Sequence, residues 1–127
     1  MYHLGKKSRS KLENVHTDLI LLVGRAICIT EIDFSVLEGR RSRKRQKELF
    51  ESGASQTMNS RHLTGHAVDL GAYVGGRIRW DWPLYDKIAV AMKTASAELN
   101  IPIKWGGDWK SFKDGPHFEL PWRKYRA

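Results

Sequence analysis

Two histidines and an aspartate are the residues of this sequence whose types and spacing best fit metal chemistry. His62 and Asp69 lie in one short segment, and His117 lies near the other end of the chain. Two imidazoles and one carboxylate are the protein ligands of open zinc sites, in which water takes the fourth position. Zinc lowers the pKa of bound water to about 7 and polarises a carbonyl, which suits amide hydrolysis. The set therefore predicts a hydrolase that binds one zinc ion per chain.

The alternation of apolar and polar residues indicates that two of these ligands lie on strands. Asp69 stands between two apolar residues, so a strand here buries its neighbours and turns Asp69 to the opposite face. Residues 117–120 alternate in the same way and present His117 on a polar face. We expect His62 to arrive from the loop ahead of the first strand, where Gly65 permits a sharp turn.

The motifs around these residues resemble those of a known enzyme family. Residues 60–69 read Ser-x-His-x-x-Gly-x-Ala-x-Asp, followed by Trp-Gly-Gly-Asp-Trp at 105–109 and Asp-x-x-His at 114–117. These motifs resemble the zinc D-alanyl-D-alanine carboxypeptidase and dipeptidase superfamily. Within it, the sequence is most similar to the phage L-alanyl-D-glutamate endopeptidases that serve as endolysins. The similarity runs over about residues 12–120, which is nearly the whole chain.

The resemblance implies a role for each residue of the site. It implies that His62, Asp69 and His117 bind zinc and that Asp114 is the catalytic base. A carboxylate beside the zinc-bound water can take its proton and pass it to the leaving amine. Glu119 shares a strand face with His117 and is the alternative, either as the base or as a partner that orients an imidazole. We favour Asp114 as the base.

Three further residues are assigned to substrate binding. Arg41 and Gln46 resemble the upstream pattern of the family, and a guanidinium can bind a substrate carboxylate or stabilise a developing oxyanion. Arg41 also lies in the basic run at 40–47, which is alternatively only a solvated helix face. Trp105 and Trp109 flank two glycines and can line a cleft or pack the core. We assign Trp105 to the substrate cleft.

The order of elements predicts an α+β fold with a small, largely antiparallel sheet packed with about three helices. With 127 residues and 41% hydrophobic content, the chain can bury one core, so we expect a single catalytic domain over 1–127. The resemblance implies the fold shared by hedgehog and DD-peptidase domains. Periodicity predicts helices over about 11–26, 42–50 and 83–99, and strands over 33–37, 67–71, 77–80, 103–105 and 117–120.

The net charge of +8 allows a different class of function. A basic domain with interspersed aromatic residues can bind nucleic acid through its phosphates. That interpretation leaves the histidine and aspartate spacing unexplained, and an anionic cell wall accounts for the same charge. A non-catalytic wall-binding domain is a third alternative, but structural zinc sites close the fourth position with a protein ligand and need no base. We therefore expect no nucleic-acid partner.

No targeting or membrane-spanning segment is expected. The longest early apolar run, 19–23, is shorter than a signal-peptide core and than the roughly 20 residues of a membrane span. We expect a monomer without a signal peptide and without stable membrane association. The resemblance implies that the protein waits in the host cytoplasm until a holin releases it to the wall.

The resemblance also implies the substrate, which is the stem peptide of peptidoglycan. Asp at position 114, where carboxypeptidase and dipeptidase relatives more often carry Glu, is what the endopeptidase branch would show. The expected reaction is hydrolysis of the L-alanyl-D-glutamate bond, leading to lysis of the host wall. A D-alanyl-D-alanine carboxypeptidase is the alternative, since it shares the zinc centre and differs only in its substrate groove.

Overall fold

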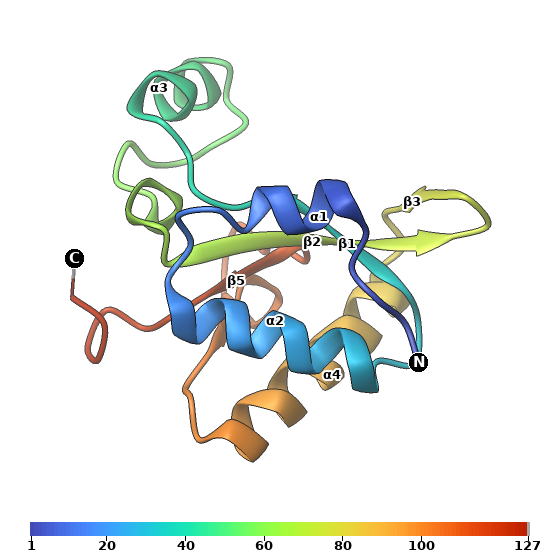
Figure 1. Cartoon of the computed structure of the whole chain (residues 1–127). Helices are drawn as coiled ribbons and strands as arrows, with labels where there is room; N and C mark the ends of the chain where they lie inside the picture. The colour runs from blue at the N-terminus through green and yellow to red at the C-terminus, as the bar shows by residue number, and fades with distance from the viewer. Residues whose placement is uncertain (127) are drawn as a thin grey trace.

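A five-stranded antiparallel sheet forms the centre of the structure, a computed structural model that describes residues 1–126 (Figure 1). Its strands follow the order β1-β2-β5-β4, and β3 pairs with β2 as a short hairpin. The elements in chain order are α1 (Lys6–Lys11), α2 (Thr17–Ile29), β1 (Phe34–Glu38), α3 (Arg43–Glu51), η1 (Arg61–Thr64), β2 (Ala67–Val74), β3 (Arg77–Arg79), α4 (Trp82–Leu99), β4 (Lys104–Trp105), η2 (Gly106–Asp108) and β5 (His117–Glu119). The predicted α+β class with an antiparallel sheet is confirmed.

The helices divide between the core and the surface. Helices α2 and α4 pack together on one side of the sheet, whereas α3 stands away from it (Figure 1). Leu22 of α2, Met92 of α4 and the strand residues Val68 and Phe118 are fully buried in one hydrophobic cluster. Burial of each such side chain stabilises the fold by about 1.5–3 kcal/mol. Among residues 1–126, no helix is both long and apolar enough to cross a membrane.

The helix predicted over 11–26 is wrong in its bounds, because the chain turns between α1 and α2. Asn14 in this turn has a φ of 64°, a left-handed conformation that ends a helix and that Asn tolerates. His16 then caps α2, since its Nδ1 accepts a hydrogen bond from the amide of Asp18 at 3.0 Å. The amide of His16 also donates to the carbonyl of Gly65 at 2.8 Å. A contact with a distant segment thus breaks the predicted helix, and the described chain has four α-helices rather than about three.

The other elements lie close to their predicted positions. Ser42 caps α3 as expected, since its Oγ accepts a hydrogen bond from the amide of Arg45 at 3.1 Å. Pro83 occupies the first turn of α4, where its missing N–H costs no hydrogen bond. The predicted face alternation of β2 is confirmed, because Val68 and Leu70 are fully buried on the core side. Asp69 between them is consequently directed away from the core.

Candidate metal centre and substrate cleft

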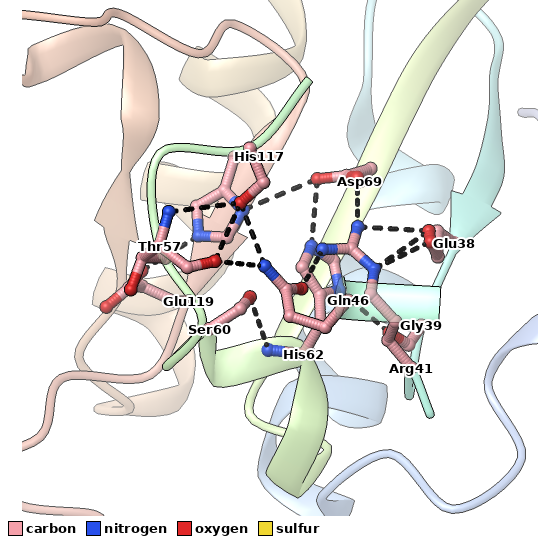
Figure 2. Close-up of polar contacts among 11 residues, drawn as sticks. Glu38, Gly39, Arg41, Gln46, Thr57, Ser60, His62, Asp69, His117 and Glu119 are labelled. Atoms are coloured by element: carbon pink, nitrogen blue, oxygen red, sulfur yellow. Dashed lines mark hydrogen bonds and ion pairs between the residues drawn. The ribbon is translucent and has the colours of Figure 1, made fainter. Parts of the chain in front are cut away.

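The sheet and one short helix bring the three predicted metal ligands together. Asp69 on β2 lies directly opposite His117 on β5 in the antiparallel register. His62 comes from η1, the 3-10 helix just before β2 (Figure 2). One ligand atom from each of the three residues lies within 4.8 Å of the others. Two side chains from one short segment and a third from near the end of the chain thus form one compact donor set.

The turn that carries His62 fixes the orientation of its ring. Ser60 caps η1 by accepting a hydrogen bond from the amide of His62, and Gly65 ends it with a φ of 77° that favours glycine. The ring Nδ1 lies 2.7 Å from the carbonyl of Gly39. Because a carbonyl only accepts, Nδ1 carries the proton in this contact. Nε2 is therefore the ring nitrogen that can bind a metal, and it lies 3.2 Å from Asp69 Oδ1.

His117 is oriented in a corresponding way by Glu119. The imidazole Nε2 lies 2.8 Å from Glu119 Oε1, and Nδ1 lies 3.4 Å from Asp69 Oδ1 (Figure 2). The Glu119 carboxylate accepts a hydrogen bond from Nε2, so Nδ1 is the ring nitrogen on the Asp69 side that can bind a metal. Carboxylates that hold metal-binding histidines in this manner tune the site and fix the tautomer. Glu119 thus occupies the orienting position that the sequence offered as one of its two roles.

The pKa values of Asp69 and His117 show how strongly the three side chains interact. Burial acts to raise the pKa of Asp69, but hydrogen bonds from His117 and His62 outweigh it, so the pKa lies well below its usual value. Burial acts to lower the pKa of His117, and contacts with Asp69 and Glu119 outweigh it and raise that pKa to about 9. Once the ring nitrogens that face Asp69 lose their protons to metal binding, the carboxylate and the two imidazoles form the N/O donor set that Zn²⁺ favours. The residues present therefore fit the ion.

Asp114 lies beside this donor set in a loop held by η2. Its amide donates to the carbonyl of Gly106 at 3.1 Å, and a Cβ at position 106 would collide with the backbone of Asp114. Burial, followed by the negative charge of Asp69, raises the pKa of Asp114, while the nearby cationic side chains oppose the rise. A raised pKa makes a carboxylate a stronger proton acceptor, which suits a general base.

The donor set opens into a cleft of about 630 Å³ that Asp114 also lines. Its walls come from the loop around 109–114 and from α3 with the segment that follows it. Besides the metal ligands and Asp114, the lining residues are Glu38, Arg41, Arg45, Leu49, Ala54, Ser55, Gln56, Thr57, Ser60, Trp109, Phe112 and Lys113. The cleft combines the candidate metal site, a nearby carboxylate and a cationic wall.

Arg41 lies in the cleft, but most of its donors bind protein groups. Its Nε lies 2.9 Å from Glu38 Oε1, its Nη2 3.0 Å from Glu38 Oε2, and its Nη1 2.7 Å from Gln46 Oε1 (Figure 2). Nη2 also faces Asp69 Oδ2 at 3.7 Å. The guanidinium is thus fixed beside the metal ligands rather than free on a solvated helix face.

The structure does not support a direct substrate contact by Gln46. The side chain is fully buried, and its amide nitrogen donates to Ser55 Oγ at 2.8 Å and to the carbonyl of Thr57 at 2.5 Å. With its oxygen bound to Arg41, all of its polar atoms have protein partners. Gln46 therefore joins Arg41 to the cleft segment that contains Ser55 and Thr57.

The assignment of Trp105 to the cleft is wrong, and Trp109 occupies that position instead. The Trp105 ring is stacked on Phe118 at 6.3 Å, and its Nε1 donates to the carbonyl of Gly115 at 2.7 Å. Trp105 belongs to the buried cluster, whereas Trp109 lines the cleft with its ring 5.1 Å from that of His117. Trp105 packs because its strand parity on β4 places it beside the buried face of β5.

Two groups of the site escaped the sequence analysis. The carboxylate of Glu38 binds Arg41 through two oxygens, and the carbonyl of Gly39 fixes the His62 ring. Glu38 pairs with Asp69 across the β1–β2 register, next to an irregularity in that pairing. Knowledge of the strand pairing would have identified Glu38, but no local pattern does so. The role of the Gly39 carbonyl has no signal in the sequence, because every residue has a backbone carbonyl.

Comparisons with known sequences point to one kind of enzyme. A model of the family described as phage L-alanyl-D-glutamate peptidase matches residues 1–120. The chain is 29% identical over 117 residues to the L-alanyl-D-glutamate peptidase of Escherichia phage T5, covering 89% of this chain and 85% of that protein. It is 34% identical over 94 residues to a Listeria phage peptidase of the same name, covering 74% of this chain and 32% of that protein.

Solved structures agree with these sequence matches. The L-Ala D-Glu endopeptidase ChiX of Serratia marcescens aligns with a TM-score of 0.93 and 46% identity, covering 98% of this chain and 95% of that one. The vancomycin-resistance D,D-dipeptidase VanXYg, solved with a D-Ala-D-Ala phosphinate analog, aligns with a TM-score of 0.53 and 20% identity, covering 84% of this chain and 50% of that one. The second match concerns the fold alone.

Proposed function

Since this chain belongs to the phage L-alanyl-D-glutamate peptidase family, we propose that it is a zinc-dependent endopeptidase of the peptidoglycan stem peptide. The bond that it hydrolyses in this proposal joins L-alanine to D-glutamate. The observation that carries the proposal is the convergence of His62 Nε2, His117 Nδ1 and the Asp69 carboxylate beside Asp114 in one cleft. The substrate is inferred from family membership, and the type of reaction is inferred from the side chains of the site.

The three ligands and Asp114 divide the work of hydrolysis. His62, Asp69 and His117 would hold the zinc ion, whose Lewis acidity would acidify water and polarise the scissile carbonyl. Asp114 accepts the proton of the attacking water and returns it to the leaving amine. Its raised pKa favours the first of these transfers. Glu119 keeps the His117 ring in place and takes no proton from the reaction.

Arg41 contributes charge close to the reacting carbonyl. Three of its donor atoms point at Glu38 and Gln46, and a guanidinium has five N–H bonds. The remaining N–H bonds and the positive charge lie in the cleft, where they stabilise the negative charge that develops on the carbonyl oxygen. A group fixed before the substrate arrives does this at little cost in reorganisation.

The surroundings of the reaction form the outer part of the proposal. The net charge of +8 attracts the protein to an anionic wall. We place its action in lysis of a bacterial host, as a monomer that reaches the wall from the host cytoplasm with the help of a separate pore-forming protein. A nucleic-acid partner is not needed to explain the charge.

Digestion of purified peptidoglycan tests the proposed bond. We expect released fragments that carry D-glutamate as the new amino terminus, identified by mass spectrometry after amino-group labelling. A pentapeptide stem should yield no free D-alanine. If D-alanine were the main product, the protein would instead be a D-alanyl-D-alanine carboxypeptidase with an unchanged metal centre.

A further inference from the structure

Arg61, the residue before metal ligand His62, ties the C-terminal segment of the chain to η1. Its Nε and Nη2 lie 3.3 and 3.0 Å from the carbonyl of Leu120, and Nη2 lies 2.6 Å from the carbonyl of Tyr125. The ring of Trp122 lies 4.0 Å from the guanidinium carbon. We call residues 121–125 the strap, because Arg61 binds the residue just before it and its last residue.

The far end of the strap is anchored to the beginning of α2. The hydroxyl of Tyr125 donates to Asp18 Oδ2 at 2.7 Å, and its ring packs edge-on against His16 at 5.2 Å. The amide of His16 in turn donates to the carbonyl of Gly65, at the end of η1. The strap contacts both η1 and the first turn of α2, and these two elements also contact each other. The three segments therefore support the backbone that carries His62.

These contacts hold η1 through groups other than the His62 ring. The ring of His62 is fixed by the carbonyl of Gly39, and the side chain of Arg61 fixes the same short helix from the strap. The carbonyl of Arg61 accepts from the amide of His66, whose own carbonyl accepts from the amide of Leu120 at 2.9 Å. Because η1 spans only Arg61–Thr64, its internal hydrogen bonds alone define its position poorly.

The burial of Arg61 indicates that it does more than fill space. The residue is 3% exposed, and within residues 1–126 its Nη1 has no hydrogen-bond partner. A buried donor without an acceptor is unfavourable, so an apolar side chain would serve packing better. The strap also lies beyond residue 120, where the match to the family model ends.

We propose that Arg61 is a positioning residue for the metal centre. By binding the strap, Arg61 holds η1 so that His62 Nε2 faces Asp69. The inference rests on the proposed zinc function. It assigns the strap a role in metal affinity although no strap residue lines the cleft. A site whose supporting contacts are lost binds its metal more weakly even when every ligand is present.

Zinc affinity measured separately from fold stability tests this role. The variants are Arg61→Met, Arg61→Lys and, within the strap, Trp122→Ala and Tyr125→Phe. The matched control is Leu22→Ala, which opens a cavity in the hydrophobic core, since Leu22 is fully buried there and does not line the cleft. Zinc dissociation constants are measured by competition with a chromophoric chelator, at a temperature at which circular dichroism shows every variant to be folded.

We expect Arg61→Met to weaken zinc binding by about 10- to 100-fold, with Arg61→Lys between it and the wild type. The two strap variants should weaken binding to a smaller extent. Leu22→Ala should lower the thermal unfolding midpoint while leaving zinc affinity unchanged. If Arg61→Met lowers only the unfolding midpoint, as the control does, the proposal is wrong. If Arg61→Met does not fold, unchanged zinc affinity in both strap variants would show that the proposal is wrong.

Hydrogen exchange of the metal-free protein separates this proposal from the zinc assignment. Amides of residues 62–66 should exchange faster in Arg61→Met than in the wild type, relative to amides of β2. Equal exchange would contradict the positioning role whether or not zinc binds. A wild-type protein that binds no zinc but shows the expected exchange pattern would instead refute the proposed function and retain Arg61 as the group that holds η1.

Discussion

The metal centre and the α3 wall of the same cleft are built in opposite ways. At the metal centre, His62 and His117 have side chains that are 2% and 7% exposed, and each ring nitrogen has a polar neighbour. On α3 the cationic side chains at 43, 44, 45 and 47 are exposed. They form no ion pair with another described residue. The side chains of the metal centre are fixed by their contacts, whereas the cationic side chains of α3 are exposed to solvent.

This difference indicates a division between chemistry and recognition. Groups held in advance at the reacting centre stabilise a transition state without reorganising, so the metal centre should control the rate. Exposed charges act over longer distances and mainly accelerate encounter with an oppositely charged partner. The α3 wall should therefore control binding to the cell wall and leave the chemical step unchanged. The following predictions test this division.

Loss of a metal ligand should have the largest effect. His117→Ala removes one of the three predicted ligands, so we expect the purified variant to contain no zinc and to show no hydrolysis. His66→Ala is the matched control, because His66 is also buried beside the site but its Nδ1 contacts Thr64 rather than the donor set. Retained zinc in the His117 variant, or lost zinc in the His66 variant, would mean that the ligands are misassigned. Metal analysis by mass spectrometry distinguishes these cases.

Removal of the base should be the next largest effect. Asp114→Asn keeps the shape of the side chain but cannot accept a proton, so we expect kcat to fall by roughly 10²-fold or more while zinc stays bound. Steady-state kinetics with a soluble stem peptide and metal analysis of the same sample measure both quantities. An active Asp114→Asn together with an inactive Glu119→Gln would reverse the two carboxylate roles.

The substitution Glu119→Gln should have an intermediate effect of a different kind. The amide oxygen still faces His117 Nε2 but lacks the charge that strengthens the hydrogen bond. We expect zinc affinity to fall by about tenfold or more, with kcat close to the wild-type value once zinc is saturating. A kcat deficit that excess zinc does not restore would place Glu119 in the chemical step.

The α3 wall should give the smallest effect. Arg45→Gln removes one unpaired charge from the cleft rim, and we expect weaker binding to peptidoglycan with an unchanged kcat on a small soluble peptide. Added salt should weaken wall binding in the same way, because charges are screened beyond about 8 Å at physiological ionic strength. Arg77→Gln on β3, which removes an exposed charge that does not line the cleft, is the control. Equal loss in both variants would attribute binding to net charge rather than to this wall.

The ligands were predictable from the sequence because strand parity is a local property. Alternation around Asp69 and His117 identified the face of each strand, and the register then placed the two residues opposite each other. The break between α1 and α2 was not predictable, since it depends on the contact of His16 with Gly65. Local periodicity cannot report a partner so far along the chain.

The same limit explains the errors at the substrate cleft. Gln46 has a polar side chain that the sequence placed toward substrate, but Ser55 and Thr57 fold back and enclose it. Trp105 and Trp109 have similar local surroundings, and only the pairing of β4 with β5 assigns the first to the core. Residue type predicted the chemistry that was available, whereas tertiary contacts decided which groups face the cleft.

Metal dependence of the unmodified protein is the most direct test of the zinc assignment. The protein is stripped with a chelator, its residual metal is determined by mass spectrometry, and hydrolysis of the soluble stem peptide is followed as zinc is added. We predict no activity without metal, and recovery that saturates at about one zinc ion per chain, as expected for a mononuclear site. Full activity in a sample verified to be free of metal would contradict the account.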